Sequence, residues 1–172
     1  MRAVVIDEFG PVDSHRLKEV DPPRVSDGEV LIDVQAIGVN FPDTLMMQGL
    51  YQTKPARPFT PGRDISGTII AVGDNVTKFK PGDRVVAIVA WGGYAEQAVA
   101  PEARCFSLPD HVDFETAAGM ITTYMTAWVA LMERGNYHTG EKVLVLGASG
   151  GVGLAAVQII KAKDGIAVGA SL

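Results

Sequence analysis

The sequence has 172 residues, which is enough for one domain or for one domain and part of a second. Hydrophobic residues make up 47% and charged residues 20% of the chain, with 19 glycines and 10 prolines, a composition that excludes a disordered chain, a collagen and a coiled coil. The 15 Lys and Arg and the 20 Asp and Glu give a net charge of -5, so we expect no nucleic-acid partner.

The first part of the chain, from Met1 to about Leu108, predicts a β domain. Short β-rich runs are separated by turn segments such as 26–28, 73–75 and 81–83, whose Gly, Pro, Asp and Asn residues favour chain reversal. This spacing is typical of a barrel or a sandwich. The expected strands cover residues 3–6, 29–36, 67–72, 84–89 and 94–99.

The hydrophobic period changes at Asp113, where we predict that a helix begins. Asp113 is a suitable N-cap, and Glu115 suits the positive helix N-terminus. The helix is expected over residues 114–134, and its apolar character on nearly every face is typical of a helix buried between layers or domains. The remainder predicts a parallel α/β unit, with a strand at 142–146, a helix at 154–163 and a second strand at 165–170.

The cysteine and apolar content predict the compartment. The single cysteine, Cys105, excludes an intramolecular disulfide and a Cys-based zinc cluster, and we interpret it as a core residue. The histidines at 15, 111 and 138 lack the spacing of metal ligands. The longest apolar stretch, residues 127–132, is far shorter than the roughly 18 residues that span a bilayer. We expect a cytoplasmic protein with no membrane span, no signal peptide and no metal site.

A glycine-rich loop follows the strand predicted at 142–146, in the place of a dinucleotide-binding turn. Backbone N–H groups and a helix N-terminus must approach a pyrophosphate closely there, and a Cβ at the crossing points would obstruct them. Gly150 and Gly153 meet this demand, whereas Ala148 departs from the strict glycine fingerprint. The alternative is a tight turn whose glycines serve packing alone. The predicted cofactor contacts are Gly147, Ala148, Ser149, Gly150, Gly151, Val152 and Gly153.

The end of the second predicted strand favours one form of the cofactor. The residue that distinguishes NAD from NADP is expected about 20 positions beyond the loop. Ala170, Ser171 and Leu172 provide no carboxylate to bond a ribose 2′-hydroxyl or to repel a 2′-phosphate. We therefore predict NADPH, with Ser171 among its contacts.

Several segments outside the loop carry a family resemblance. Gly38–Asp43, Pro61–Gly67, Pro81–Val85 and Gly92–Glu96 match a shared pattern, as do residues 117–118 and 126–128. Together with the loop they resemble the zinc-independent NADPH:quinone oxidoreductases, the zeta-crystallin group of the medium-chain dehydrogenase/reductase superfamily. The resemblance covers nearly all of the chain.

The resemblance implies an α/β fold with a large β part. A GroES-like β-barrel catalytic domain would occupy residues 1–123, and residues 124–172 would form a linking helix and the first βαβ unit of a Rossmann domain. Because members of the superfamily are considerably longer, we expect a truncated Rossmann part with uncovered apolar faces. A fragment, an engineered deletion and an incomplete record of a longer chain all account for such a length.

Metal-free chemistry is also implied. Zinc-dependent members have a Cys ligand where this chain has Asn40, and His and Glu where it has Arg63 and Asp64. Since these residues do not rebuild the zinc site, the hydride acceptor must itself be electrophilic, as a quinone or an α,β-unsaturated carbonyl is.

The resemblance further implies the catalytic residues. Asn40 and Asp43 would lie near the nicotinamide, Tyr51 would close over it, and Thr126 would contact its ring or ribose. Each has a plainer alternative: Asn40 satisfies backbone groups at a strand end, Asp43 caps a helix, Tyr51 packs its ring, and Thr126 bonds the preceding helical turn.

Three functions remain open from the sequence. The first is an NADPH-dependent reductase of quinones or enones. The second is an enoyl-thioester reductase of the same superfamily, and the third is a non-catalytic protein that retains the fold. A homodimer formed through sheet edges is expected for the first.

Overall fold

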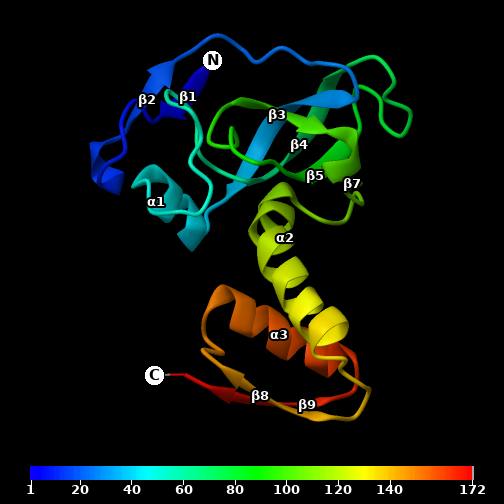
Figure 1. Cartoon of the computed structure of the whole chain (residues 1–172). Helices are drawn as coiled ribbons and strands as arrows, with labels where there is room; N and C mark the ends of the chain where they lie inside the picture. The colour runs from blue at the N-terminus through cyan, green and yellow to red at the C-terminus, as the bar shows by residue number, and fades with distance from the viewer. Residues whose placement is uncertain (172) are drawn as a thin grey trace. The chain divides into compact units, whose positions relative to one another are not determined.

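The structure, a computed structural model, describes residues 1–171 and shows an α/β chain in which strands dominate the first part (Figure 1). The chain divides into two units, Met1–Gly119 and Met120–Leu172, and the boundary lies inside helix α2 (Phe114–Trp128). The boundary predicted after residue 123 falls within the same helix. Each unit has its own sheet.

The first unit contains a five-stranded antiparallel sheet with the order β6-β3-β4-β5-β7. The bounds are β3 (Glu29–Gly38), β4 (Asp64–Val72), β5 (Arg84–Ile88), β6 (Gln97–Pro101) and β7 (Cys105–Ser107). Alternating residues of these strands point to one face and bury an aliphatic core, which stabilises the sheet by the apolar area removed from water. The core comprises Val30, Ile32, Ile65, Ile69, Val85, Ala87, Val89, Ala98, Ala100 and Cys105.

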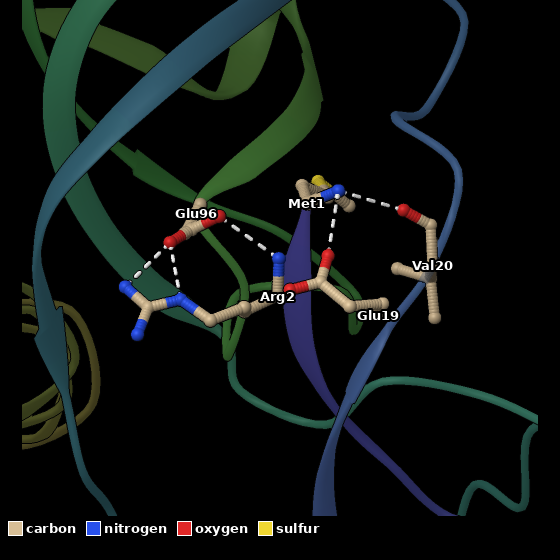
Figure 2. Close-up of polar contacts among 5 residues, drawn as sticks. All are labelled: Met1, Arg2, Glu19, Val20 and Glu96. Carbon is tan, nitrogen blue, oxygen red and sulfur yellow. Dashed lines mark hydrogen bonds and ion pairs between the residues drawn. The ribbon is translucent and has the colours of Figure 1, made fainter.

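A separate hairpin, β1 (Arg2–Val5) and β2 (Arg16–Glu19), holds the start of the chain against the segment before β6 (Figure 2). The Met1 ammonium donates to the Val20 carbonyl oxygen at 2.8 Å and pairs with Glu19 at 3.5 Å. Arg2 donates its backbone N–H to Glu96 Oε2 at 2.8 Å and its Nε–H to Oε1 at 2.6 Å. These two bonds hold the pKa of Glu96 below its ordinary value. The start of the chain is thereby joined to a residue 94 positions away, in the segment before β6.

The short elements were not all predicted. β2 is exposed along its whole length and carries one apolar residue, so it lacks the alternation that marks a half-buried strand. β7 has only three residues. β6 begins at Gln97 and not at Tyr94, because Ala95 pairs as an isolated bridge with Ala3 of the hairpin. Two short 3-10 turns occur at Val12–Ser14 and Glu102–Arg104.

Helix α1 (Phe41–Met47) directly follows β3. Asn40 is its N-cap, and a proline in the first turn matches the backbone angles that a helix start requires. The inner face of α1 buries Met46 and Met47 against Ile6 and Phe59, forming a second, smaller core. This packing fixes the direction in which the residues at the start of α1 are presented.

The second unit contains β8 (Lys142–Leu146), α3 (Gly151–Ala162) and β9 (Ile166–Ala170), with β8 and β9 parallel. This is the strand, loop, helix and strand order that the sequence predicts. The helix predicted over 114–134 is α2 followed by a π-helical segment, Val129–Arg134, and Asp113 accepts the Thr116 N–H at its start as predicted. No helix within residues 1–171 has both the length and the apolar character that a bilayer crossing needs.

One face of the β8–β9 sheet is apolar and open to solvent. Leu144 and Leu146 are 63% and 75% exposed, and Ile166 and Val168 are each 50% exposed. On the other side, Ala155 and Ile159 of α3 are buried together with Ala127. The unit therefore covers one side of its sheet and leaves apolar residues of both strands in water.

Candidate functional site

The glycine-rich loop between β8 and α3 makes a tight turn that depends on two of its glycines. Gly147 has φ +69°, a left-handed conformation in which a side chain is strained. The Gly150 N–H donates to the Gly147 carbonyl oxygen at 3.0 Å. A Cβ on Gly153 would lie 2.2 Å from that same oxygen, so only glycine allows the helix start to approach the turn so closely.

The start of α3 faces this turn with unused backbone donors. The first bond of the helix runs from the Leu154 N–H to the Gly150 carbonyl oxygen, so Gly151, Val152 and Gly153 have no acceptor within the helix for their N–H groups. No acidic residue occupies the first turn. These groups border a cavity of about 360 Å³, and a helix N-terminus of this kind attracts an anion such as a phosphate. These N–H groups and the cavity beside them are suited to the diphosphate of a dinucleotide.

The structure separates the predicted cofactor contacts into groups. Gly147 and residues 150–153 line the 360 Å³ cavity, whereas Ala148 and Ser149 do not. The Ala148 N–H donates to the Ala170 carbonyl oxygen at 3.1 Å, which brings the end of β9, and thus Ser171, next to the loop. Leu172 lies outside the described residues. Thr126 is exposed and lines a neighbouring cavity of about 460 Å³ that shares Ala130 with the first.

In the first unit, four polar side chains form one hydrogen-bonded network. Asp43 Oδ2 accepts the Asn40 backbone N–H at 2.8 Å and the Tyr94 hydroxyl at 2.9 Å. The Asn40 side-chain Nδ2 donates to Asp64 Oδ2 at 3.0 Å. Asn40 and Asp43 also form a capping box at the start of α1. The plainer alternatives for both residues therefore correspond to real contacts: Asn40 bonds backbone groups after β3, and Asp43 contributes to the cap of α1. Asp43 lies inside the first turn of the helix and not before it.

This network is buried. Asp43 and Asp64 are 0% and 1% exposed. Burial raises the pKa of Asp43 above its ordinary value, although the donors Asn40 and Tyr94 act in the opposite direction. Burial and the neighbouring carboxylate of Asp43 raise the pKa of Tyr94, so its hydroxyl remains a donor at neutral pH. Within the described residues, Asp43 Oδ1 and Arg63 Nε are buried without a hydrogen-bond partner.

The network contains two residues that the sequence did not predict as catalytic or cofactor contacts, although Asp64 stands at the position of a zinc ligand in other members of the superfamily. Tyr94 and Asp64 lie in the segments that carry the family pattern, but nothing local links them to Asn40 and Asp43. Tyr51, in contrast, packs against the core that contains Met46 and Phe59. None of the network's hydrogen bonds involves the Tyr51 hydroxyl, and the closure of Tyr51 over a nicotinamide stays a prediction.

Removal of the Tyr94 hydroxyl is expected to destabilise the first unit. Tyr94→Phe deprives buried Asp43 Oδ2 of one of its two donors, and a buried acceptor that loses a donor costs about 1–3 kcal/mol. Urea unfolding of the full chain measures the change. Tyr51→Phe is the matched control, for which we expect a change within about 0.5 kcal/mol. Equal unfolding midpoints for the two variants would contradict the network.

The raised pKa of Asp43 makes the stability depend on pH. The folded protein binds the Asp43 proton more tightly than the unfolded chain, whose carboxyl has the ordinary value of 3.8. The associated stability is therefore present below the unfolded pKa and is lost as pH rises through the folded pKa. Asp43→Asn removes this loss while its amide oxygen still accepts both bonds. Unfolding free energies at about pH 3 and about pH 7 should show the variant gaining on the wild type as pH rises; a constant difference refutes the assignment.

Two further kinds of chemistry depend on particular side chains: metal binding and reaction at the Cys105 thiol. Among residues 1–171, no three or more His, Cys, Asp and Glu residues lie together as metal ligands. Cys105 is 7% exposed in the main core, and burial raises its pKa to about 12. The burial of Cys105 in the main core agrees with the packing role that the sequence predicts for it.

Known proteins are similar to this chain over the β-rich first part and over nearly its whole length. Residues 26–110 match the alcohol dehydrogenase GroES-like domain. Human quinone oxidoreductase is 46% identical over 164 residues, which cover 94% of this chain and 50% of that relative. The crystal structure of the human synaptic vesicle membrane protein VAT-1 homolog-like protein has a TM-score of 0.94 and 38% identity, covering 98% of this chain and 55% of that chain.

Escherichia coli quinone oxidoreductase, solved in complex with NADPH, has a TM-score of 0.88 and 30% identity over 98% of this chain and 52% of that chain. The chain spans about half the length of the curated relatives it matches. The glycine loop and the GroES-like sheet occur here in the order that the resemblance implies. Residues 26–110 thus match an alcohol dehydrogenase GroES-like domain, and nearly the whole chain is similar to about half of the length of the quinone oxidoreductases.

Proposed function

We propose that this chain carries the cofactor loop and part of the catalytic unit of an NADPH-dependent oxidoreductase that needs no metal. The observation that supports it most directly is the loop at Gly147–Gly153, where the N–H groups at the start of α3 border a cavity and no acidic side chain opposes an anion. The NADPH complex of the Escherichia coli relative supports the choice of dinucleotide.

Each unit contributes its own residues to the proposed reaction. In the second unit, the loop N–H groups and the α3 N-terminus bind the diphosphate of NADPH, and Ser171 contributes at the end of β9 without repelling a 2′-phosphate. The bound cofactor supplies a hydride from its nicotinamide. In the first unit, Asn40 and Asp43 orient the reacting groups. We assign residues 1–123 to the catalytic domain and 124–172 to the nucleotide-binding part.

The acceptor we propose is a quinone or an α,β-unsaturated carbonyl. Both are electrophilic without a metal, so the protein has to position them and stabilise the charge that develops on oxygen. Asn40, which bonds Asp64, stands where zinc ligands occur in other members of the superfamily, as do Arg63 and Asp64. Solvent or Tyr51 supplies the proton to the reduced oxygen.

The test is a fluorescence titration of the full 172-residue chain with NADPH, followed by addition of a small benzoquinone to the same sample. Quenching or enhancement that saturates, followed by quinone-dependent loss of NADPH absorbance, is the expected result. Asn40→Ala should bind NADPH as the wild type does and lose turnover. If the chain binds NADPH but does not reduce the quinone, its role is limited to cofactor binding. If the chain is folded and does not bind NADPH, the proposed function is wrong for this chain.

The cellular setting and assembly form part of the same proposal. A cytoplasmic homodimer fits the single buried thiol of Cys105 and the open apolar face of the β8–β9 sheet. Sedimentation at several concentrations measures the assembly. A monomer at all concentrations would remove the dimer from the proposal without affecting the cofactor site.

A further inference from the structure

We propose that Asp64 is a positioning residue, which fixes the polarity of the Asn40 side-chain amide so that Asn40 offers an N–H donor to a carbonyl oxygen of the bound ligand. The role of Asn40 rests on the function proposed above. The orientation of its amide does not, because it follows from contacts within the first unit alone.

An asparagine side chain has two ends of opposite character. Its oxygen accepts hydrogen bonds, its nitrogen donates two, and rotation of the amide by half a turn exchanges them. An ionised carboxylate only accepts, so a carboxylate beside the amide determines which end turns toward it. Asp64 Oδ2 lies 3.0 Å from Asn40 Nδ2. The amide nitrogen is therefore the end that faces Asp64.

Asp64 is itself held in place on both sides. It begins the central strand β4, where its backbone pairs with Gly38 of β3 and with Ile88 of β5. Its side chain is almost completely buried. A Cβ on Gly38 would come within 2.9 Å of the Asp64 Cβ, so the glycine leaves the room that the carboxylate needs. An acceptor fixed in this way can orient a neighbouring group.

Asn40 is held from its other side by the start of α1. Its backbone N–H bonds to Asp43, which the Tyr94 hydroxyl fixes in turn. The Asp43 backbone N–H donates to the Asn40 backbone carbonyl oxygen at 3.0 Å, within the capping box that these two residues form. One hydrogen of Nδ2 is used by Asp64, and the part of the chain that the structure describes provides no acceptor for the second. Asn40 is half-buried, so this N–H remains available to a ligand.

The second N–H of the Asn40 side chain is a hydrogen-bond donor, so the ligand atom that it binds must be an acceptor. An N–H donor suits a carbonyl oxygen, which becomes more negative when a hydride is added to a conjugated acceptor. A bond from the same nitrogen to a carboxylate polarises the amide and makes its orientation unique. The carboxamide oxygen of the nicotinamide and the carbonyl oxygen of the acceptor share this chemistry.

The first test is a 15N NMR spectrum of the Asn40 side-chain NH2 in the wild-type chain. We expect the Asn40 side-chain proton that faces Asp64 to exchange with water more slowly than the side-chain protons of exposed Asn136. In Asp64→Asn the new amide can present either its oxygen or its nitrogen to Asn40, so the Asn40 proton that faces residue 64 should exchange faster, whereas Asp33→Asn on β3 should leave its exchange unchanged. Asn40 signals that exchange as fast as those of Asn136 in the wild type overturn the proposal even if Asp64→Asn does not fold.

The ligand is tested in separate additions. NADPH alone should shift the second Asn40 N–H signal if the nicotinamide carboxamide is the acceptor, and a benzoquinone should shift it if the substrate carbonyl is. In turnover, Asp64→Asn should lower kcat about tenfold with KM for NADPH within about twofold. Equal kcat values for the variant and the wild type contradict the positioning role. A wild type without turnover would reject the proposed reductase, while the NMR comparison still decides the orientation of Asn40.

Discussion

Gly153→Ala is expected to weaken cofactor binding roughly 100-fold and to destabilise the second unit. The added Cβ would lie 2.2 Å from the Gly147 carbonyl oxygen and 2.8 Å from the Ala148 Cα, and both are backbone atoms that no side-chain rotation moves away. Overpacking of this severity exceeds the usual cost of about 1–3 kcal/mol. Because the loop and the α3 N-terminus must separate, the N–H groups that border the cavity no longer converge on one anion.

The measurement is an NADPH titration together with circular dichroism and urea unfolding of the full chain. A loss of about 3 kcal/mol at the cofactor site corresponds to a roughly 100-fold weaker affinity. Gly150→Ala separates the two roles of the loop, since Gly150 has φ -78° and its added Cβ would stay 3.4 Å from the nearest atom. That variant should fold and still bind NADPH more weakly, because its methyl group blocks close approach of the diphosphate.

Wild-type affinity in Gly153→Ala would show that the loop glycines do not shape a dinucleotide site. Unchanged affinity in Gly150→Ala alone would place the diphosphate elsewhere along the loop. The two variants together therefore show whether the loop glycines serve only the packing of the turn or also leave space for the diphosphate.

The second unit was predictable from sequence because its signals are local. A continuous apolar run predicts β8, and the glycine-rich segment that follows is confined to seven consecutive residues. The largest deviation is the start of α3 at Gly151, three residues ahead of the predicted residue 154. Gly151, Val152 and Gly153 have low helix propensity, and the turn bond from Gly150 to Gly147 overrides it.

The polar network could be predicted only in part, because its members are distant in the sequence. Asn40 and Asp43 lie three positions apart, at the spacing of a capping box, and the motif contains both. Tyr94 lies 51 positions from Asp43, and Asp64 lies 24 positions from Asn40. These contacts arise from the pairing of β3 with β4 and from the packing of the segment before β6, and no period or spacing in the sequence encodes them.

Gly38→Ala is expected to disrupt the first unit at the point where the network is anchored. Its Cβ would lie 2.3 Å from the Ala118 carbonyl oxygen and 2.9 Å from the Asp64 Cβ, so the end of β3 would have to move away from β4 or from the start of α2. The Ala118 carbonyl belongs to helix α2 and the Asp64 Cβ to strand β4, so neither atom can move without moving its element. We therefore expect a loss of more than about 3 kcal/mol in the free energy of unfolding. The Asn40 to Asp64 hydrogen bond, which depends on the same spacing, should be lost with it.

Two glycine variants control for effects other than steric overlap. Gly28→Ala has φ +71° and nothing within 4 Å of its added Cβ, so its cost of about 1–2 kcal/mol reports backbone strain alone. Gly119→Ala lies in exposed helix with open space around it and should stabilise the chain by about 0.5–1 kcal/mol. If Gly38→Ala costs no more than Gly28→Ala in the same urea series, then β3, β4 and α2 adjust to one extra methyl group. Asp64 is then not rigid enough to hold the Asn40 amide in a single orientation.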